Sequence, residues 1–190
     1  MKQVILASKS PRRKELLARL GFPFTCVEAN TEEKIDSSLP LGQAIELVAK
    51  EKAQVISRQY PDHIVIGADT IVALDGVVYG KPKDEADAMR MLEELSGIEH
   101  DVITGVCLAC GEQTMTFHSH ERVKFYPLTK EEIEEYVASQ EPLDKAGAYG
   151  IQGRGAMLVE WIHGDFFSIM GLPVALLARK FKEFTGNDEF

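Results

Sequence analysis

A long buried strand is predicted by the stretch His63-Ile-Val-Ile-Gly-Ala-Asp-Thr-Ile-Val-Ala-Leu-Asp-Gly76. Apolar residues lie on both sides of its centre, and Asp75-Gly76 is a pair that favours the type I′ turn, so Val77–Tyr79 is expected to return as a hairpin strand. Asp69 places a carboxylate within this strand, beside a glycine and an alanine that leave room for a neighbour. A buried carboxylate needs a partner, which is a metal ion, a cation or, in a purely structural site, neighbouring backbone N–H groups.

Strands and helices follow one another irregularly along the rest of the chain. Helices are expected, from capping and apolar periodicity, at residues 11–20, 41–57, 84–95, 129–139 and 173–184. Further strands are expected at residues 4–7, 24–27, 100–109, 114–125, 157–162 and 166–169. This order predicts an α/β fold with a long mixed sheet and flanking helices rather than a regular βαβ array. A chain of 190 residues has the size of one domain, which we expect to cover residues 1–190.

The chain carries 30 acidic against 21 basic residues, a formal net charge of -9. A field of this sign repels DNA, RNA and anionic lipid, so we expect neither a nucleic-acid polymer nor a membrane as partner. No apolar stretch approaches the roughly 20 residues that span a bilayer, and the first apolar run is too short for a signal peptide. The three cysteines suit a reducing compartment. These features predict a soluble cytoplasmic protein that must hold any anionic ligand with locally placed cations.

The segment Ser8-Lys-Ser-Pro-Arg-Arg13 follows a predicted buried strand and opens a helix. Ser10 is placed to cap that helix, with a proline at its first position. The segment gathers the hydroxyls of Ser8 and Ser10, free backbone N–H groups and the guanidiniums of Arg12 and Arg13 around one helix N-terminus. This is an anion-binding arrangement. The alternative is an ordinary capped helix with two solvated arginines.

Three further charged positions complete the candidate site. Lys52 lies on the apolar face of the helix at residues 41–57, so its ammonium must meet a specific partner or snorkel to water. Lys81, in Gly80-Lys-Pro82, sits where glycine permits a close approach, although this tripeptide is common in loops. Glu32-Glu33 would add oxygen ligands that favour Mg²⁺ or Mn²⁺ over zinc, unless both acids are simply solvated.

Two other patterns are set aside. Cys107 and Cys110 have redox spacing, but residues three apart on a strand point to opposite faces, so their thiols would diverge. His118 and His120 share one strand face, yet no third ligand lies near them in the sequence, and a zinc site is not expected. Residues 145–155 hold four of the fifteen glycines, which predicts a loop with unusual dihedrals or a close approach.

Seven segments in this order resemble the Maf family of nucleoside triphosphate pyrophosphatases over nearly the whole chain. They are Leu6-Ala-Ser-Lys-Ser-Pro-Arg-Arg13, Glu32-Glu33, Ala49-Lys-Glu-Lys-Ala53, Gly67-Ala-Asp-Thr70, Gly80-Lys-Pro82, Leu95-Ser-Gly97 and Asp144-Lys-Ala-Gly-Ala-Tyr-Gly-Ile-Gln-Gly153. The resemblance implies hydrolysis of a nucleoside triphosphate between its α and β phosphorus atoms, with Mg²⁺ or Mn²⁺ as cofactor. It also implies a mixed α/β fold like that of the inosine triphosphatases, with the nucleotide in a cleft between two lobes.

The resemblance also implies roles for individual residues. Asp69 matches the family's catalytic acidic residue, as the acceptor of a proton from the attacking water or as a metal ligand. Arg13, Lys52 and Lys81 match its phosphate-binding cations, and Glu33 matches a further acidic position that would bind the metal with Asp69. Five cations from four separate segments are expected to meet in the cleft: Arg12, Arg13, Lys52, Lys81 and Lys145.

Three positions resemble the branch of the family that acts on dTTP and UTP, namely Arg12, Thr70 and Gln152. The branch that acts on 7-methyl-GTP instead has an aromatic residue for the arginine and an acid for the glutamine. A glutamine amide both donates to and accepts from a uracil or thymine edge. The resemblance thus implies removal of dTTP, UTP and modified pyrimidine triphosphates from the nucleotide pool, and it leaves a homodimer open. The competing function is a non-catalytic nucleotide- or DNA-binding regulator of septum formation, whose DNA-binding form the net charge opposes.

Overall fold

The computed structural model describes residues 2–186, which form two compact units. Unit 1 is built from residues 2–69, 104–119 and 171–186, and unit 2 from residues 70–103 and 120–170. Each unit gathers segments that are far apart in the sequence. The single domain and the cleft between lobes both stay predictions. Within residues 2–186, no helix combines the length and the apolar character needed to cross a bilayer.

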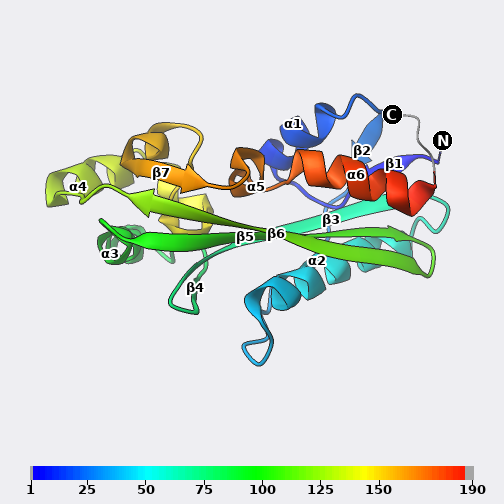
Figure 1. Cartoon of the computed structure of the whole chain (residues 1–190), viewed down its shortest axis with the longest axis horizontal. Coiled ribbons are helices and arrows are strands. Elements are labelled where there is room, and N and C mark those ends of the chain that lie inside the picture. The colour runs from blue at the N-terminus through cyan, green and yellow to red at the C-terminus, as the bar shows by residue number, and fades with distance from the viewer. Residues whose placement is uncertain (1, 187–190) are drawn as a thin grey trace. The chain divides into compact units, whose positions relative to one another are not determined.

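Seven strands of the described chain form one open mixed sheet (Figure 1). They are β1 (Val4–Leu6), β2 (Phe24–Cys26), β3 (Ile64–Leu74), β4 (Val77–Tyr79), β5 (Glu99–Cys110), β6 (Gln113–Phe125) and β7 (Val159–His163). Their order is β2-β1-β3-β5-β6-β7, and β4 pairs with β3 outside this path. β1 runs parallel to β2 and β3, whereas β4 is antiparallel to β3 and β7 is antiparallel to β6. The predicted α/β fold with a mixed sheet is confirmed.

Unit 1 packs helices on both faces of its strands (Figure 1). α2 (Leu41–Ser57) covers one face, while α1 (Pro11–Ala18) and α6 (Val174–Thr185) cover the other. Because side chains alternate along a strand, Ile5 of β1 and Val65 of β3 face α2 and form a buried cluster with alanines of that helix. Unit 1 is therefore a sandwich of helix, sheet and helix.

Gly67 lets α2 lie directly against β3. A Cβ atom at this position would overlap the carbonyl oxygen of Ala49 and lie 2.8 Å from the backbone nitrogen of Ala53, both on α2. Gly105 of β5 has the same role one strand away, since a Cβ atom there would lie 2.5 Å from the carbonyl oxygen of Ile45. The two glycines bring the helix and the sheet into backbone contact, and this closeness determines where the side chains of α2 reach.

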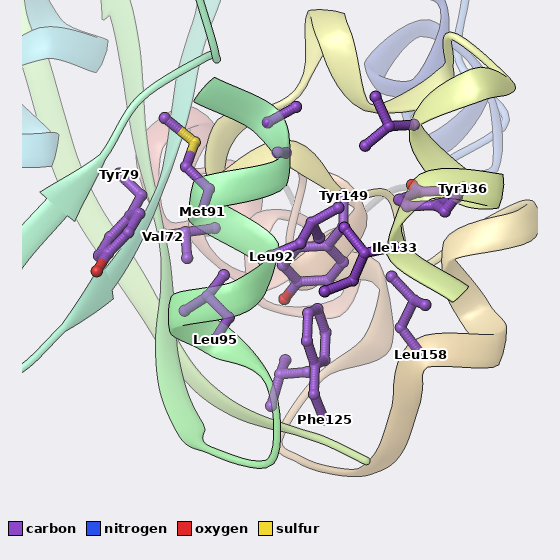
Figure 2. Packing of buried hydrophobic residues seen from close by; sticks show 14 of the residues in the cluster. Val72, Tyr79, Met91, Leu92, Leu95, Phe125, Ile133, Tyr136, Tyr149 and Leu158 are labelled. Atoms are coloured by element: carbon purple, nitrogen blue, oxygen red, sulfur yellow. The ribbon is translucent and has the colours of Figure 1, made fainter. Parts of the chain in front are cut away.

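Unit 2 has a core of its own around Leu92, Phe125 and Tyr149 (Figure 2). Its helices are α3 (Glu85–Leu95), α4 (Lys130–Ala138) and α5 (Phe166–Met170), with the short 3-10 helices η1 (Glu141–Asp144), η2 (Ala146–Ala148) and η3 (Arg154–Leu158). The rings of Phe125 and Tyr149 meet edge to face with centroids 4.7 Å apart, and Figure 2 shows Tyr149 beside Leu92. The glycine-rich residues 145–155 are therefore anchored in the core by a tyrosine of their own.

Most predicted elements are confirmed because local chemistry determines them. Asp75 and Gly76 have φ values of 50° and 80°, the left-handed pair of a type I′ turn, between β3 and β4. Thr129 and Glu132 form the predicted capping box at the start of α4. In both cases a few adjacent residues supply all the hydrogen bonds or dihedral preferences that the structure needs.

The strand predicted at residues 166–169 is wrong, because this segment forms α5. Asp165 precedes it and accepts the N–H of Phe167 at its carboxylate, 2.9 Å away, and the N–H of Ile169 at its carbonyl, 3.2 Å away. These two bonds start and close a helical turn. The aromatic pair Phe166-Phe167 favours a strand by propensity, but the cap and the helical bond outweigh that preference.

Acidification is expected to destabilise unit 2 through His100. The side chain is buried, its Nε2 lies 2.8 Å from the hydroxyl oxygen of Tyr149, and burial lowers its pKa from 6.5 to about 4. Between these values the unfolded chain binds a proton that the folded protein does not. The free energy of unfolding should therefore fall by about 3 kcal/mol as the pH drops from 6.5 to about 4.

Urea unfolding of the wild type and of His100→Gln across this pH range measures the contribution. The carboxylates titrate in both proteins and cancel in the difference, so the variant should show the shallower dependence of unfolding free energy on pH. Two parallel curves would contradict a buried, neutral His100.

Candidate functional site

Four charged side chains of unit 1 converge beside the middle of β3: Arg13 of α1, Glu33 of the loop before α2, Lys52 of α2 and Asp69 of β3. Lys52 Nζ lies 2.7 Å from Glu33 Oε1 and 2.8 Å from Asp69 Oδ1. Arg13 Nη2 lies 3.8 Å from Asp69 Oδ1. Lys52 and Asp69 are only 6% and 8% exposed, so the ammonium does not snorkel to water. The partner that the buried carboxylate requires is thus a pair of cations.

The parallel pairing of β1 with β3 accounts for the place of Asp69. Leu6, the last residue of β1, lies opposite Ile66, so β3 continues past the carboxyl end of β1 toward Asp69. The chain leaves β1 at this same end and enters α1, which carries Arg13. Ligands of open α/β sheets bind outside the carboxyl ends of parallel strands, and the four charges lie in that position.

Lys52 reaches Asp69 because α2 and β3 touch at Gly67. Gly67 and Asp69 share one face of β3, since side chains alternate along a strand. Lys52 lies between Ala49 and Ala53, the two residues of α2 that a side chain at position 67 would strike. The close approach at Gly67 therefore directs the side chain of Lys52 toward the carboxylate of Asp69, the next residue on the same face of the strand. The sequence predicted room beside Asp69, and the structure fills it with Lys52.

Ser10 caps α1 as predicted. Its hydroxyl oxygen accepts the N–H of Arg13 at 3.4 Å, and the hydroxyl oxygen of Ser8 accepts the N–H of Ser10 at 3.1 Å. Arg12 is half-buried beside them. Both hydroxyls therefore lie at the helix N-terminus, as the anion-binding interpretation requires, while binding of an anion here stays a prediction.

Arg13 is fixed by a partner that sequence reasoning missed. Its Nε donates to the carbonyl oxygen of Gly171 at 2.9 Å, although the two residues are 158 positions apart. Burial lowers the pKa of the guanidinium, while the carboxylates of Asp69 and Glu33 act to raise it. Arginine nevertheless stays charged at neutral pH. No local pattern links Gly171 to Arg13, so only the folded chain reveals this contact.

Three other predicted site residues belong to unit 2. Thr70 follows Asp69 directly on β3 and is half-buried. Lys81 is exposed between β4 and α3, and Gln152 is exposed within residues 145–155. The polar groups of Lys81 and Gln152 are therefore accessible to a ligand, and their roles in binding stay predictions.

Lys145, the fourth predicted residue of unit 2, is engaged by its own segment. Its Nζ donates to the carbonyl oxygen of Glu141 at 2.6 Å and to the carboxylate of Asp144 at 2.7 Å. A substrate phosphate would have to compete with Asp144 for this ammonium, so Lys145 is less available to an anion than the sequence suggested.

Comparison with known proteins tests the resemblance carried by the seven segments. A model of the Maf-like protein family matches residues 3–184. The chain belongs to the Maf-like family. The dTTP/UTP pyrophosphatase of Bacillus cereus (strain ATCC 10987 / NRS 248) is 48% identical over 184 residues, which cover 97% of this chain and 91% of the relative. That of Bacillus cytotoxicus is 49% identical over 184 residues, covering 97% of this chain and 96% of the relative.

A solved structure supports the fold of this Maf-like chain. The Staphylococcus aureus Ham1 protein matches it with a TM-score of 0.50 at 12% sequence identity, covering 83% of this chain and 80% of that one. At this identity the likeness concerns the fold alone. It agrees with the mixed α/β fold that the seven segments imply.

The charges of the Maf-like site balance. Arg13 and Lys52 offset Glu33 and Asp69, so a triphosphate would enter a cluster with no net positive charge of its own. Among residues 2–186, no group of three or more His, Cys, Asp or Glu side chains is arranged to hold a metal ion. Two convergent carboxylates suit Mg²⁺ or Mn²⁺, which bind through one or two carboxylates together with substrate phosphates. Glu33 and Asp69 are therefore the carboxylates that would hold such an ion.

The patterns set aside from the sequence are explained by ordinary partners. His118 Nδ1 lies 2.6 Å from Glu46 Oε1, and His120 Nε2 lies 2.8 Å from Asp101 Oδ1, so each imidazole has a different acid. Burial raises the pKa of the Cys107 thiol to about 12, which leaves it unreactive at neutral pH. All three cysteines of the Maf-like chain are free thiols.

Proposed function

We propose that this chain hydrolyses dTTP and UTP to the nucleoside monophosphate and pyrophosphate with a divalent cation, Mg²⁺ or Mn²⁺. The observation that carries the proposal is the buried Asp69, held between Lys52 and Arg13 at the carboxyl end of a parallel strand pair. The relatives named dTTP/UTP pyrophosphatase, which align along 97% of this chain, support the same reaction.

Asp69 and the two cations divide the work of hydrolysis. A water molecule attacks the α phosphorus, its proton passes to the carboxylate of Asp69, and pyrophosphate leaves with the electrons of the broken P–O bond. Lys52 and Arg13 bind phosphate oxygens whose negative charge grows in the transition state. Glu33 would hold the metal ion, joined by Asp69 if Asp69 is a ligand rather than the base, and the ion when bound supplies the positive charge that the balanced cluster lacks.

Base recognition is the second part of the proposal. Gln152 pairs with the edge of thymine or uracil, because one amide offers both a donor and an acceptor. Arg12 and Thr70 complete the recognition of the nucleotide, and Ser8 and Ser10 present the helix N-terminus to a phosphate. Lys81 and Lys145 add charge for the leaving pyrophosphate, the latter after release from Asp144.

Wild-type protein incubated with dTTP and Mg²⁺ is expected to release dTMP and pyrophosphate over many turnovers. The same assay with UTP, CTP, modified uridine triphosphates and 7-methyl-GTP tests recognition, and kcat/KM for dTTP and UTP should exceed that for CTP by about tenfold or more. EDTA should stop the release, and Mg²⁺ or Mn²⁺ should restore it.

Two results of this assay would contradict the proposal in different ways. Nucleotide that binds but is not cleaved would favour a sensor of the nucleotide pool over an enzyme. A preference for 7-methyl-GTP would overturn the pyrimidine assignment and leave the hydrolytic reaction intact.

A further inference from the structure

The glycine-rich loop, residues 145–155, is folded around the carboxylate of Glu141. Oε1 of Glu141 accepts the N–H of Gly155 at 3.1 Å, and Oε2 accepts the N–H of Arg154 at 3.0 Å. Oε1 also accepts the hydroxyl proton of Tyr136 at 3.0 Å. One carboxylate therefore binds two successive backbone N–H groups of the loop and one side chain of α4.

Tyr136 extends this anchor to the other side of the loop. Its hydroxyl oxygen accepts the N–H of Gly150 at 3.1 Å while its proton goes to Glu141. Figure 2 shows its ring packed beside Ile133 in the core of unit 2, so the hydroxyl is a fixed point. Burial raises the pKa of Tyr136, which keeps the hydroxyl protonated and able to donate. Gln152 lies in sequence between Gly150 and the two N–H groups bound by Glu141.

The glycines of the loop are required by this anchor. A Cβ atom at Gly153 would lie 2.9 Å from Oε2 of Glu141, and one at Gly155 would lie 2.7 Å from the hydroxyl oxygen of Tyr136. Gly153 also has a φ of 104°, which other residues rarely adopt. The backbone on both sides of Gln152 therefore contacts the carboxylate of Glu141 and the hydroxyl of Tyr136 directly, because the glycines have no side chains to intervene.

The charge of Glu141 matters for this arrangement. Although burial, the largest single cause, acts to raise its pKa, the N–H groups of Arg154 and Gly155, the hydroxyl of Tyr136 and the charge of Lys145 together lower it, so the group is ionised. Both oxygens of a carboxylate accept, whereas the amide of a glutamine would present its NH₂ to one of the two N–H groups. Charge-assisted bonds of this kind are also stronger than neutral ones.

We propose that Glu141, with Tyr136, is the positioning residue that holds Gln152 for recognition of the pyrimidine base. The proposal rests on the proposed function, because Gln152 is the base-reading residue there. Glu141 itself touches neither phosphate nor base in this scheme. It acts through the backbone, by fixing the residues on both sides of Gln152 so that the exposed amide is presented in one orientation.

The test compares binding as well as turnover in Glu141→Gln, in Gln152→Ala and in the double variant. Dissociation constants for the non-hydrolysable α,β-methylene analogues of dTTP and CTP, measured with Mg²⁺ by calorimetry, give a discrimination ratio independent of catalysis. Glu141→Gln should reduce this ratio by about tenfold and raise KM for dTTP more than it lowers kcat. Because both residues serve one function, the double variant should discriminate no worse than Gln152→Ala alone.

Glu135→Gln is the matched control. Glu135 also contacts the loop, but only through an exposed ion pair with the side chain of Arg154 at 2.7 Å, so its loss should leave the ratio unchanged. Tyr136→Phe is the second variant, which removes a single hydroxyl and should reduce the ratio in the same direction. It provides the test if Glu141→Gln does not fold.

The outcomes separate this proposal from the proposed function. A discrimination ratio that is unchanged in Glu141→Gln and Tyr136→Phe would overturn the positioning role. The role would also be overturned if the double variant lost discrimination by the product of the two single-variant losses. A wild-type protein that binds the dTTP analogue preferentially but releases no pyrophosphate would overturn the hydrolysis alone. A wild-type protein with no preference between the analogues would overturn the positioning role and the base recognition together.

Discussion

Asp69→Asn is expected to lower kcat for dTTP hydrolysis by about 10³-fold. Asparagine keeps the size of the side chain and an oxygen that can accept from Lys52, but it has no charge and cannot take a proton from water. The substitution also removes the buried negative charge that lies 2.8 Å from Lys52 Nζ and 3.8 Å from Arg13 Nη2 and that offsets the charge of these two cations. Pyrophosphate release at saturating dTTP measures the effect, with circular dichroism to verify the fold.

Asp75→Asn is the control for this substitution. Asp75 lies on the exposed turn at the end of the same strand with a φ of 50°, a conformation that asparagine adopts readily, so kcat should stay at the wild-type value. Activity of Asp69→Asn above about a tenth of wild type corresponds to a barrier change below about 1.4 kcal/mol. Such a small change would remove Asp69 from the centre of the mechanism.

The two roles open to Asp69 respond differently to metal concentration. If Asp69 binds the ion, the loss of activity in Asp69→Asn should become smaller as the concentration of Mg²⁺ or Mn²⁺ is raised, because a higher concentration fills a weakened metal site. If Asp69 takes the proton, the loss should persist at saturating metal. Titration of the variant with Mn²⁺ therefore assigns the role without a bound structure.

The parts of this fold that the sequence predicted are those with local causes. The turn at Asp75-Gly76 and the caps at Ser10 and Thr129 each involve a few adjacent residues, and all three are present as predicted. The same locality explains the error at residues 166–169. There two aromatic residues favour a strand by propensity, but Asp165 just before them caps a helical turn.

The structure brings four of the predicted site residues together, Arg13, Glu33, Lys52 and Asp69, through contacts that the sequence did not predict. Asp69 and Lys52 were conspicuous because each places a charge among apolar residues, and their pairing follows once α2 is known to lie on β3. The carbonyl of Gly171 on Arg13 and the carboxylate of Glu141 under the glycine-rich loop had no such signal. Both depend on segments that meet only in the folded chain, so neither spacing nor periodicity could have revealed them.

Gly67→Ala is expected to reduce both stability and activity, since it pushes α2 away from β3. The new Cβ atom would overlap the carbonyl oxygen of Ala49 and lie 2.8 Å from the backbone nitrogen of Ala53, and backbone cannot yield as a flexible side chain does. The free energy of unfolding should fall by about 3 kcal/mol. Displacement of Lys52 from Asp69 should lower kcat/KM for dTTP by about 10²-fold.

Gly105→Ala separates these two effects. Its Cβ atom would lie 2.5 Å from the carbonyl oxygen of Ile45, so this variant also forces α2 away from the sheet. The displacement occurs at the helix turn that carries Ile45, however, and not at the turn that carries Lys52. Urea unfolding should show comparable losses of stability for the two variants. If stability alone governed the rate, their activities would fall together. A much larger loss of kcat/KM in Gly67→Ala would instead show that the glycine matters because its contact with α2 sets the distance between Lys52 and Asp69.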